Sequence, residues 1–437
     1  MPRDGSRAPG RSLRALDLLN FFLADAQTGF GAFVAVYLTA NKWTAGQIGL
    51  TLSIGTVATM VSQIPCGALV DAIRSKRAAL ALGIAAITLA ALLLALLPYR
   101  LPVAMAEVLH GFASCVLTPA VAAVSLRLVG HAALGERLGR NARFAAIGSG
   151  LAAAVMGGIG TYVSTQSVFL LTAALALPAL VALAAIAPAA DTARESARVP
   201  FDVAGLRGLL ADRRVLAFAG CVVMFHLANA AMLPIAARNV TAATGSFATL
   251  IIAVCIVVPQ AVVALTSPAV GARANAWGRR PILLIGWAAL PVRAALFALL
   301  PVPALIVPAE LLDGVSAAVF GVMLPLIAAD LTRGKGHFNL CLGIFGLTTA
   351  VGATLSNTLA GLIADAGGDR LAFASLAVAG LLGALFLWVA MPETGPTGPT
   401  AAPGERRAGR TPLPPPDAPD PKWRRPSSPV AATITTR

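Results

Sequence analysis

The stretch GALVDAIRSKR, residues 67–77, places one acid and three bases inside an otherwise strongly apolar chain. It lies between two apolar runs, at about residues 46–70 and 78–98. Each run is near the roughly 20 residues that a helix needs to cross a ~30 Å hydrocarbon core. A second stretch, GARANAWGRR, residues 271–280, stands between runs at about 247–270 and 281–301. A charged turn between two spans, present twice, predicts a duplicated membrane protein.

The composition agrees with a membrane protein. Of 437 residues, 57% are hydrophobic and only 12% are charged, and the mean hydropathy is +0.81. Soluble domains carry about 25% charged residues. The formal net charge of +14 would suit a nucleic-acid binder, but the bases lie in short loops and two tails and do not form one face. We therefore expect the lipid bilayer, and no nucleic acid, as the partner.

Twelve apolar runs have the length of membrane spans. They lie at about residues 16–40, 46–70, 78–98, 101–126, 141–164, 168–187, 215–237, 247–270, 281–301, 303–328, 339–364 and 371–391. An even number puts both termini on the same side. Lysines and arginines concentrate in the tails and in alternate loops, so the positive-inside rule makes that side cytoplasmic. No cleavage site follows the basic N-terminus, so we expect a retained tail and an inner membrane location in a bacterium.

The expected organisation has five parts. They are a cytoplasmic tail at 1–15, a six-helix bundle at 16–187, a cytoplasmic linker at 188–214, a second bundle at 215–391 and a disordered tail at 392–437. Residues 201–214 have an apolar side and a charged side, which is typical of a short interfacial helix. The proline- and arginine-rich C-terminal tail cannot bury a core.

The two halves repeat each other at a nearly constant offset. Gly67 and Asp71 match Gly271 and Asn275, 204 positions later. Residues 21–26, 95–98 and 107–111 match residues 225–230, 298–301 and 310–314 in the same order. Because six spans separate the copies, both have the same orientation, which is a parallel repeat about an axis along the membrane normal.

Both charged stretches resemble the signature of the major facilitator superfamily between its second and third helices and the echo between its eighth and ninth. The matching residues are Gly67, Asp71, Lys76 and Arg77 in the first copy and Gly271, Gly278, Arg279 and Arg280 in the second. Arg74 departs from a usual glycine, and Asn275 replaces the usual acid. The resemblance covers about residues 13–391. It implies an all-α polytopic fold of 12 transmembrane helices in two parallel six-helix bundles.

In that superfamily these loops hold one conformation and release it during alternation, so the resemblance implies a cytoplasmic gating motif that also includes Asn275. Asp71 has two candidate partners, which are the N-terminal amides of a neighbouring helix or a basic residue among Arg137, Arg140 and Arg143. The simpler alternative is a positive-inside anchor. Arg74, Lys76 and Arg77 suit an anchor, but an anchor does not need Asp71.

Polar residues also fall inside the predicted spans. They are Asp25, Gln27, Glu107, His110, His226, Asn229, Arg293, Glu310 and Asp313. A charge at a helix centre costs roughly 2.5–3.5 kcal/mol on the lenient insertion scale. Most of these side chains should therefore face a wet cavity or each other, and we take them as candidates for proton coupling and substrate binding.

The candidates carry different hypotheses. Asp25 is either a proton carrier or a structural hydrogen-bond acceptor, and its repeat mate Asn229 cannot titrate. Arg293 and Asp313 should lie at similar depth and form an ion pair. Glu107 stands where drug-exporting members of the superfamily often have arginine, and this inversion could favour a cationic or amine-bearing substrate.

The two intramembrane histidines lie on helices expected to line the central cavity. His110 and His226 could titrate near neutral pH, but a packed structural histidine is the commoner case.

The chain lacks recognisable enzyme chemistry. It has no phosphate-binding loop of the Walker type, no nucleophile elbow and no metal-ligand spacing, and the five cysteines are typical of small buried hydrophobes. We expect no cofactor and no metal. The leading hypothesis is a monomeric secondary transporter that exports a small organic molecule by alternating access in exchange for protons. An uptake symporter of the same fold and a non-transporting sensor or scaffold are the alternatives.

Overall fold

The computed structural model describes residues 10–28, 30, 33–34, 37–38, 41–43, 45–73, 75–187, 203–236, 248–299, 306–335 and 337–395. Thirteen helices form within them, and the described part contains no strand. The helices are α1 (Gly10–Thr28), α3 (Ala45–Ala72), α4 (Lys76–Leu96), α5 (Arg100–Val129), α6 (Leu134–Tyr162), α7 (Thr165–Ala185), α8 (Val203–Ala211), α9 (Arg213–Asn229), α11 (Ala248–Trp277), α12 (Arg279–Leu299), α13 (Ile306–Leu331), α14 (Phe338–Gly367) and α15 (Asp369–Ala390).

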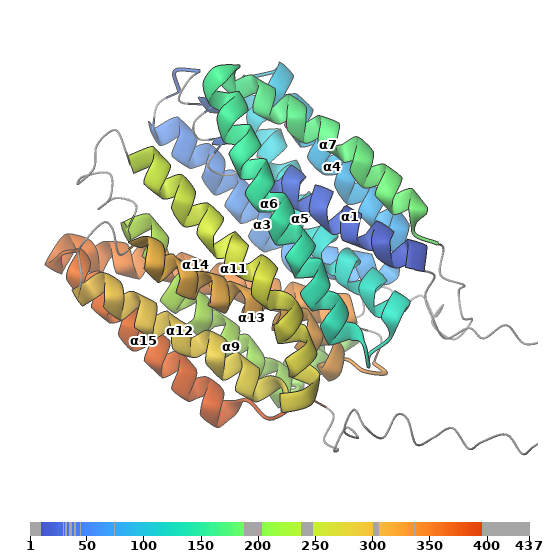
Figure 1. The fold of residues 1–437 in the computed structure, drawn as a ribbon, viewed down its shortest axis with the longest axis vertical. Helices are drawn as coiled ribbons and strands as arrows, with labels where there is room; N and C mark the ends of the chain where they lie inside the picture. The colour runs from blue at the N-terminus through green and yellow to red at the C-terminus, as the bar shows by residue number, and fades with distance from the viewer. Residues whose placement is uncertain are drawn as a thin grey trace, which may run out of the picture. The chain divides into compact units, whose positions relative to one another are not determined.

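The helices through α7 pack on one another, and so do those from α9 onward. In the first group α1 contacts α6 and α7, and α5 contacts α3 and α4; in the second, α12 contacts α13 and α15, and α14 contacts α9 and α15. Figure 1 shows the first group in blue to green and the second in green to red. We call them the N-bundle and the C-bundle. They meet where α11 packs on α6 and α14 packs on α3.

Ten of the described helices are long and apolar enough to cross a membrane. The other two predicted spans correspond to the 19-residue α1, whose span continues into residues that are only partly described, and to α11. The short helix α8 lies within the predicted linker. Most of that linker and the C-terminal tail beyond residue 395 lie outside the described residues.

Three helix ends lie six or seven residues beyond the predicted span boundaries: α1 begins at Gly10 and not at about 16, α11 ends at Trp277 and not at about 270, and the third is the start of α6. The fifth span was expected to begin at about residue 141, but α6 begins at Leu134. Arg137 and Arg140, counted as loop residues in the sequence, therefore lie on the first turns of a helix. They were misplaced because charged residues lower the apolar signal, and their acidic partner lies far away in the sequence.

Side-chain size explains the close packing. Many fully buried positions are alanine or glycine, for example Ala90 and Ala106 at 0% exposure, so helices approach closely. Large apolar side chains such as Val181 and Val389 are about 70% exposed, as expected for a surface that faces lipid tails.

Candidate functional site

Asp71, at the C-terminal end of α3, binds the N-terminus of α14. Its carboxylate accepts hydrogen bonds from the Asn339 side-chain amide at 2.6 Å, the Asn339 backbone N–H at 3.3 Å and the Leu340 backbone N–H at 2.9 Å. The first amides of a helix have no intrahelical acceptor and carry the positive end of the helix dipole. Asp71 of the N-bundle therefore caps a helix of the C-bundle. Of the two candidate partners of Asp71, the helix N-terminus is the one found.

The backbones meet closely at this contact. A Cβ atom added to Gly67 would collide with the carbonyl oxygen of Asn339, so the close approach requires glycine. Lys76 holds the turn after α3, because its Nζ donates to the carbonyls of Val70 and Ile73 at 2.5 and 3.0 Å. The Arg77 guanidinium lies 3.4 Å from the carbonyl of Ala184 on α7.

The second copy of the motif makes the matching contact between α11 and α6. Asn275 donates from Nδ2 to the carbonyl of Ala132 at 3.2 Å, just before α6 begins. A Cβ on Gly271 would collide with the carbonyl of Gly135. Because an amide replaces the acid here, this contact is a neutral hydrogen bond and lacks the charge of the first one. Gly278 takes a φ of +91° between α11 and α12, a conformation that favours glycine.

Arg279 connects elements within the C-bundle. Its buried guanidinium donates to Asp330 on α13 at 2.9 Å and to Asn275 at 3.0 Å. The carboxylate of Glu393, after α15, accepts hydrogen bonds from the backbone amides of Arg279 and Arg280 at 2.8 and 3.1 Å. Burial alone raises the pKa of Glu393, but these amides, the amide of Gly395 and the Arg279 charge together lower it below the ordinary carboxyl value.

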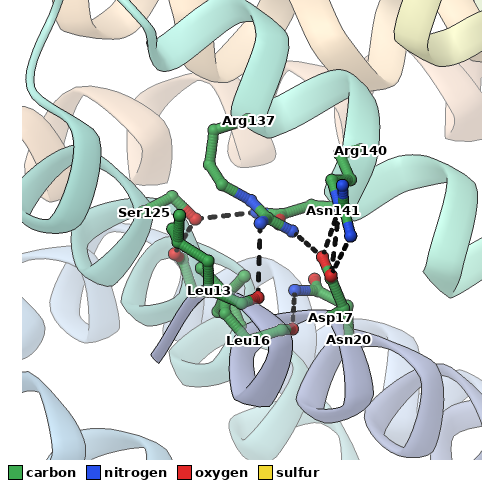
Figure 2. Close-up of polar contacts among 9 residues, drawn as sticks. Leu13, Leu16, Asp17, Asn20, Ser125, Arg137, Arg140 and Asn141 are labelled. Carbon is green, nitrogen blue, oxygen red and sulfur yellow. Dashed lines mark hydrogen bonds and ion pairs between the residues drawn. The ribbon is translucent and has the colours of Figure 1, made fainter. Parts of the chain in front are cut away.

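A buried ion cluster that the sequence did not reveal joins α1 to α6 near the same end of the N-bundle. Asp17, with a side chain 4% exposed, pairs with Arg137 and with Arg140, the latter at 2.6 Å. Arg137 also donates to Asn141 at 2.8 Å, and Asn141 donates to Ser125 at 2.7 Å, as Figure 2 shows. The spacing of Arg137 and Arg140, three residues apart on one helix face, was the available signal.

The predicted pair of Arg293 and Asp313 is present, and it belongs to a larger cluster. Arg293 donates to Asp313 at 2.5 Å and to the Asn229 side chain at 2.8 Å. Its other terminal nitrogen donates to both carboxylate oxygens of Glu310, at 2.7 and 2.8 Å. Arg293 and Glu310 are 1% and 0% exposed. One guanidinium thus holds two carboxylates, and three helices of the C-bundle are tied together.

Glu107, on α5, has no such counterion among the described residues. It is 5% exposed, and its Oε1 has no hydrogen-bond partner within the described part of the chain. Its other oxygen lies against Gly55 of α3, because a Cβ added there would stand 2.5 Å from Oε2. One turn along α5, the ring of His110 stacks on Phe30 with centroids 4.1 Å apart, and its Nε2 lies 3.5 Å from the Ser114 hydroxyl.

His226 on α9 packs among aromatic rings. The rings of Phe225 and Phe320 lie edge-on to the imidazole, with ring centroids 5.2 and 4.9 Å from its own. The Nε2 atom of His226 has no hydrogen-bond partner among the described residues. The side chains of Asp25 and Gln27 lie outside the described ones.

A cavity of about 650 Å³ lies between the bundles, next to the α3–α14 contact. Helices α1, α3, α5, α6, α13 and α14 line it. Its polar lining consists of Asn20, Gln63, Ser114, Thr118, Asn141, Ser149 and Thr349, and no charged side chain lines it among the described residues. Of the two intramembrane histidines, only His110 is on a helix that lines this cavity; α9, which carries His226, contributes no lining residue.

Comparison with known proteins identifies the fold. Residues 16–259 and 227–434 each match the family model of the Major Facilitator Superfamily. The chain belongs to this superfamily. Two curated proteins of Mycobacterium tuberculosis, from strains CDC 1551 and H37Rv, are both described as uncharacterized MFS-type transporters. Each is 38% identical over 394 residues, which is 88% of this chain and 94% of theirs.

Solved structures agree on the fold. A proton:xylose symporter, XylE, bound to 6-bromo-6-deoxy-D-glucose superposes with a TM-score of 0.70 at 13% identity, over 88% of this chain and 96% of that one. FucP, a superfamily transporter in the outward conformation, superposes with a TM-score of 0.67 at 16% identity, over 87% of this chain and 98% of that one. The predicted fold class, two parallel six-helix repeats, is confirmed. The protein is a multi-pass membrane transporter of the secondary type and is not an enzyme.

Proposed function

We propose that this protein exports a small organic molecule by alternating access, in exchange for protons. The observation that carries the proposal is a cavity between two bundles that are held together at one end by two repeat-related contacts, Asp71 with α14 and Asn275 with the start of α6. Contacts of this kind can break and reform without disturbing either bundle, which is what alternation requires.

The end that carries these contacts faces the cytoplasm in this proposal. The basic residues at that end support this orientation under the positive-inside rule; examples are Lys76 at the start of α4, Arg127 in the last turn of α5 and Arg333 in the turn after α13. With both contacts made, the cytoplasmic end is closed, and the cavity would exchange with the opposite side. The likeness to FucP in the outward conformation is in keeping with this state.

Proton coupling is supported by carboxylates inside the membrane. Glu107 is buried without a described basic partner, and an unpaired buried carboxylate is stable mainly in its neutral, protonated form. Asp25 is the second candidate, on helix α1 beside the cavity-lining residues Leu23 and Ala24. The likeness to a proton:xylose symporter supports the proposal of proton coupling.

The cavity lining supports export as the direction of transport. Apolar side chains and a few uncharged amides and hydroxyls suit an amphiphilic molecule better than a highly hydrated one. Amphiphiles enter cells through the bilayer without a carrier, so export is the direction in which a carrier is useful. Uptake by symport is the competing function, and the likeness to the xylose symporter favours it.

The experiment is a flux assay on purified protein in liposomes that contain a pH-sensitive dye. Organic cations, neutral amphiphiles, sugars and organic acids are added outside, with an imposed proton gradient of either sign. Antiport predicts that substrate movement and proton movement are opposite. Co-movement would replace export with symport. No flux with any compound, from protein shown to be folded, would refute the proposal and favour a sensor or scaffold.

A further inference from the structure

The two bundles carry the same carboxylate, but among the described residues only the C-bundle supplies its counterion. Glu107 and Glu310 are repeat mates, 203 positions apart, on α5 and α13. Helices α4 and α12 begin at Lys76 and Arg279, also 203 positions apart, and both have 21 residues. The position that matches Arg293 is therefore Ala90. At this position of the N-bundle, the guanidinium that binds Glu310 has no equivalent.

The packing confirms that the two sites are in register. Gly111 of α5 lies against the backbone oxygen of Gly55, and Gly314 of α13 lies against the backbone oxygen of Pro259. Gly111 and Gly314 are 203 positions apart, and Gly55 and Pro259 are 204 positions apart. Glu107 and Glu310 both precede these glycines by four residues, which is one helical turn. The carboxylates therefore occupy equivalent places, and the difference lies in residues 90 and 293.

The consequence for Glu107 is electrostatic. Both oxygens of Glu310 accept from Arg293 at 2.7 and 2.8 Å, whereas Oε1 of Glu107 has no partner among the described residues. Each carboxyl is at least 95% buried. A buried carboxylate without a cation is strongly disfavoured, so Glu107 must either hold a proton or receive a cation from outside the chain.

The surroundings of Glu107 leave this choice open. Ala90 is fully buried and ends at Cβ, and Gly55 has no side chain to meet Oε2. The charged residues of α3 and α4, Asp71, Lys76 and Arg77, all lie at the far end of those helices. On α5 itself the nearest titratable group is His110, and on α1 it is Asp25, whose side chain is outside the described ones.

One face of α5 leads from this carboxylate to a residue that lines the central cavity. Glu107, His110 and Ser114 lie three and four residues apart and so share one face of α5. The His110 ring is 3.5 Å from the Ser114 hydroxyl, and Ser114 lines the cavity. A ligand in the cavity would need to extend about two helical turns along this face to reach Glu107.

We propose that Glu107 binds the cationic head group of the transported molecule, an ammonium, guanidinium or amidinium, in the place that Arg293 takes in the C-bundle. This inference rests on the proposed function and names its substrate class. The carboxyl group gives up its proton when the cation binds, and the carboxylate takes the proton back when the cation leaves. One cation is therefore exchanged for one proton at a single group.

The test compares benzamidinium, a planar amidinium cation, with benzamide, its neutral isostere, on the purified full chain in nanodiscs. Calorimetry in buffers of different ionisation enthalpy measures both affinity and the number of protons released. Benzamidinium should bind with release of close to one proton at pH 7, and benzamide should bind at least tenfold more weakly. Glu107→Gln should weaken benzamidinium binding about 10- to 100-fold and abolish the proton release. Glu136→Gln, which removes an exposed acid on α6, is the matched control and should change neither.

The decisive variant is Ala90→Arg, which supplies the missing guanidinium. It should weaken benzamidinium binding about as much as Glu107→Gln does, because the new guanidinium would occupy the carboxylate. Benzamidinium binding that is unchanged in Glu107→Gln would overturn the inference, whether or not Ala90→Arg folds. In liposomes, proton-coupled flux of neutral compounds that is equal in wild type and Glu107→Gln would overturn this inference and leave the proposed function standing. Absence of all flux would refute the proposed function itself.

Discussion

Replacing Asp71 by asparagine should open the α3–α14 contact by a predictable amount. The substitution keeps the size of the side chain and removes the charge that faces the N-terminus of α14. The wild-type carboxylate accepts three hydrogen bonds, at 2.6, 2.9 and 3.3 Å. Asparagine can keep one acceptor oxygen, and its NH₂ group would face N–H donors.

The magnitude follows from these contacts. A hydrogen bond to a charged group contributes about 1.5–3 kcal/mol and a neutral one about 0.5–1.5 kcal/mol, and the helix dipole adds about 0.3–1 kcal/mol. Allowing for the bond that asparagine retains, the closed contact should lose about 2–3 kcal/mol. The population of the open state should then rise about 30- to 150-fold, since each 1.4 kcal/mol is a factor of ten.

The assay measures the thiol-labelling rate of a cysteine at Gln63. This residue lines the cavity directly behind the contact, so an impermeant reagent added on the side of Asp71 reaches it only when the contact opens. Four of the five native cysteines are buried and should react slowly. When opening is fast relative to labelling, the rate is proportional to the open population. Asp71→Asn should raise it 30- to 150-fold.

The matched control is Asn275→Ala at the other contact. It removes one neutral hydrogen bond, 3.2 Å long, to Ala132, so the labelling rate should rise only about fivefold. Equal effects of the two variants, or no effect of Asp71→Asn, would refute the view that the Asp71 charge holds the bundles together.

Three further outcomes are expected. Arg293→Met leaves the buried Glu310 and the partly buried Asp313 without their cation and should lower the free energy of unfolding in detergent by about 3–5 kcal/mol. Arg333→Met, whose side chain is 58% exposed, should change the free energy of unfolding by less than about 1 kcal/mol, and similar values for the two variants would argue against the buried cluster. Gly271→Leu should drive α11 away from α6 and raise the labelling rate at Gln63, and a rate equal to wild type would show that the backbones are not in close contact. Because folding lowers the pKa of Glu393, its contribution to stability is present above the unfolded pKa near 4.3 and is lost as the pH falls through the folded pKa. The difference in melting temperature between wild type and Glu393→Gln should therefore be constant from pH 7 to about 5.5 and shrink below about pH 4. A difference that grows on acidification would contradict this assignment.

The sequence predicted the fold well, because hydropathy and repetition are local signals. Span length and the repeated charged turns determined the helix number and the parallel repeat. The pair of Arg293 and Asp313 was also predictable, since two opposite charges at equal depth in lipid have few other solutions. The participation of Glu310 in the same cluster could not be predicted, because it depends on the directions in which side chains point from α12 and α13.

Contacts between distant segments were the part that the sequence could not reveal. Asp17 was overlooked at the edge of the first span, and its partners Arg137 and Arg140 were counted as loop residues about 120 positions away. Asp71 had two equally reasonable partners, and only the packing of α14 on α3 distinguished them. The asymmetry between Glu107 and Glu310 emerged once the repeat was combined with the observed pairing of Arg293.

The central claim is that the bundles open at one end as they close at the other, and distances between spin labels test it most directly. One label pair, at Ala72 and Lys335, reports on the end that carries Asp71, and a second, at Tyr99 and Leu299, reports on the opposite end; all four residues are exposed. In nanodiscs, Asp71→Asn should lengthen the first distance and shorten the second relative to wild type. A change at the first end with none at the second, or lengthening at both, would contradict alternating access.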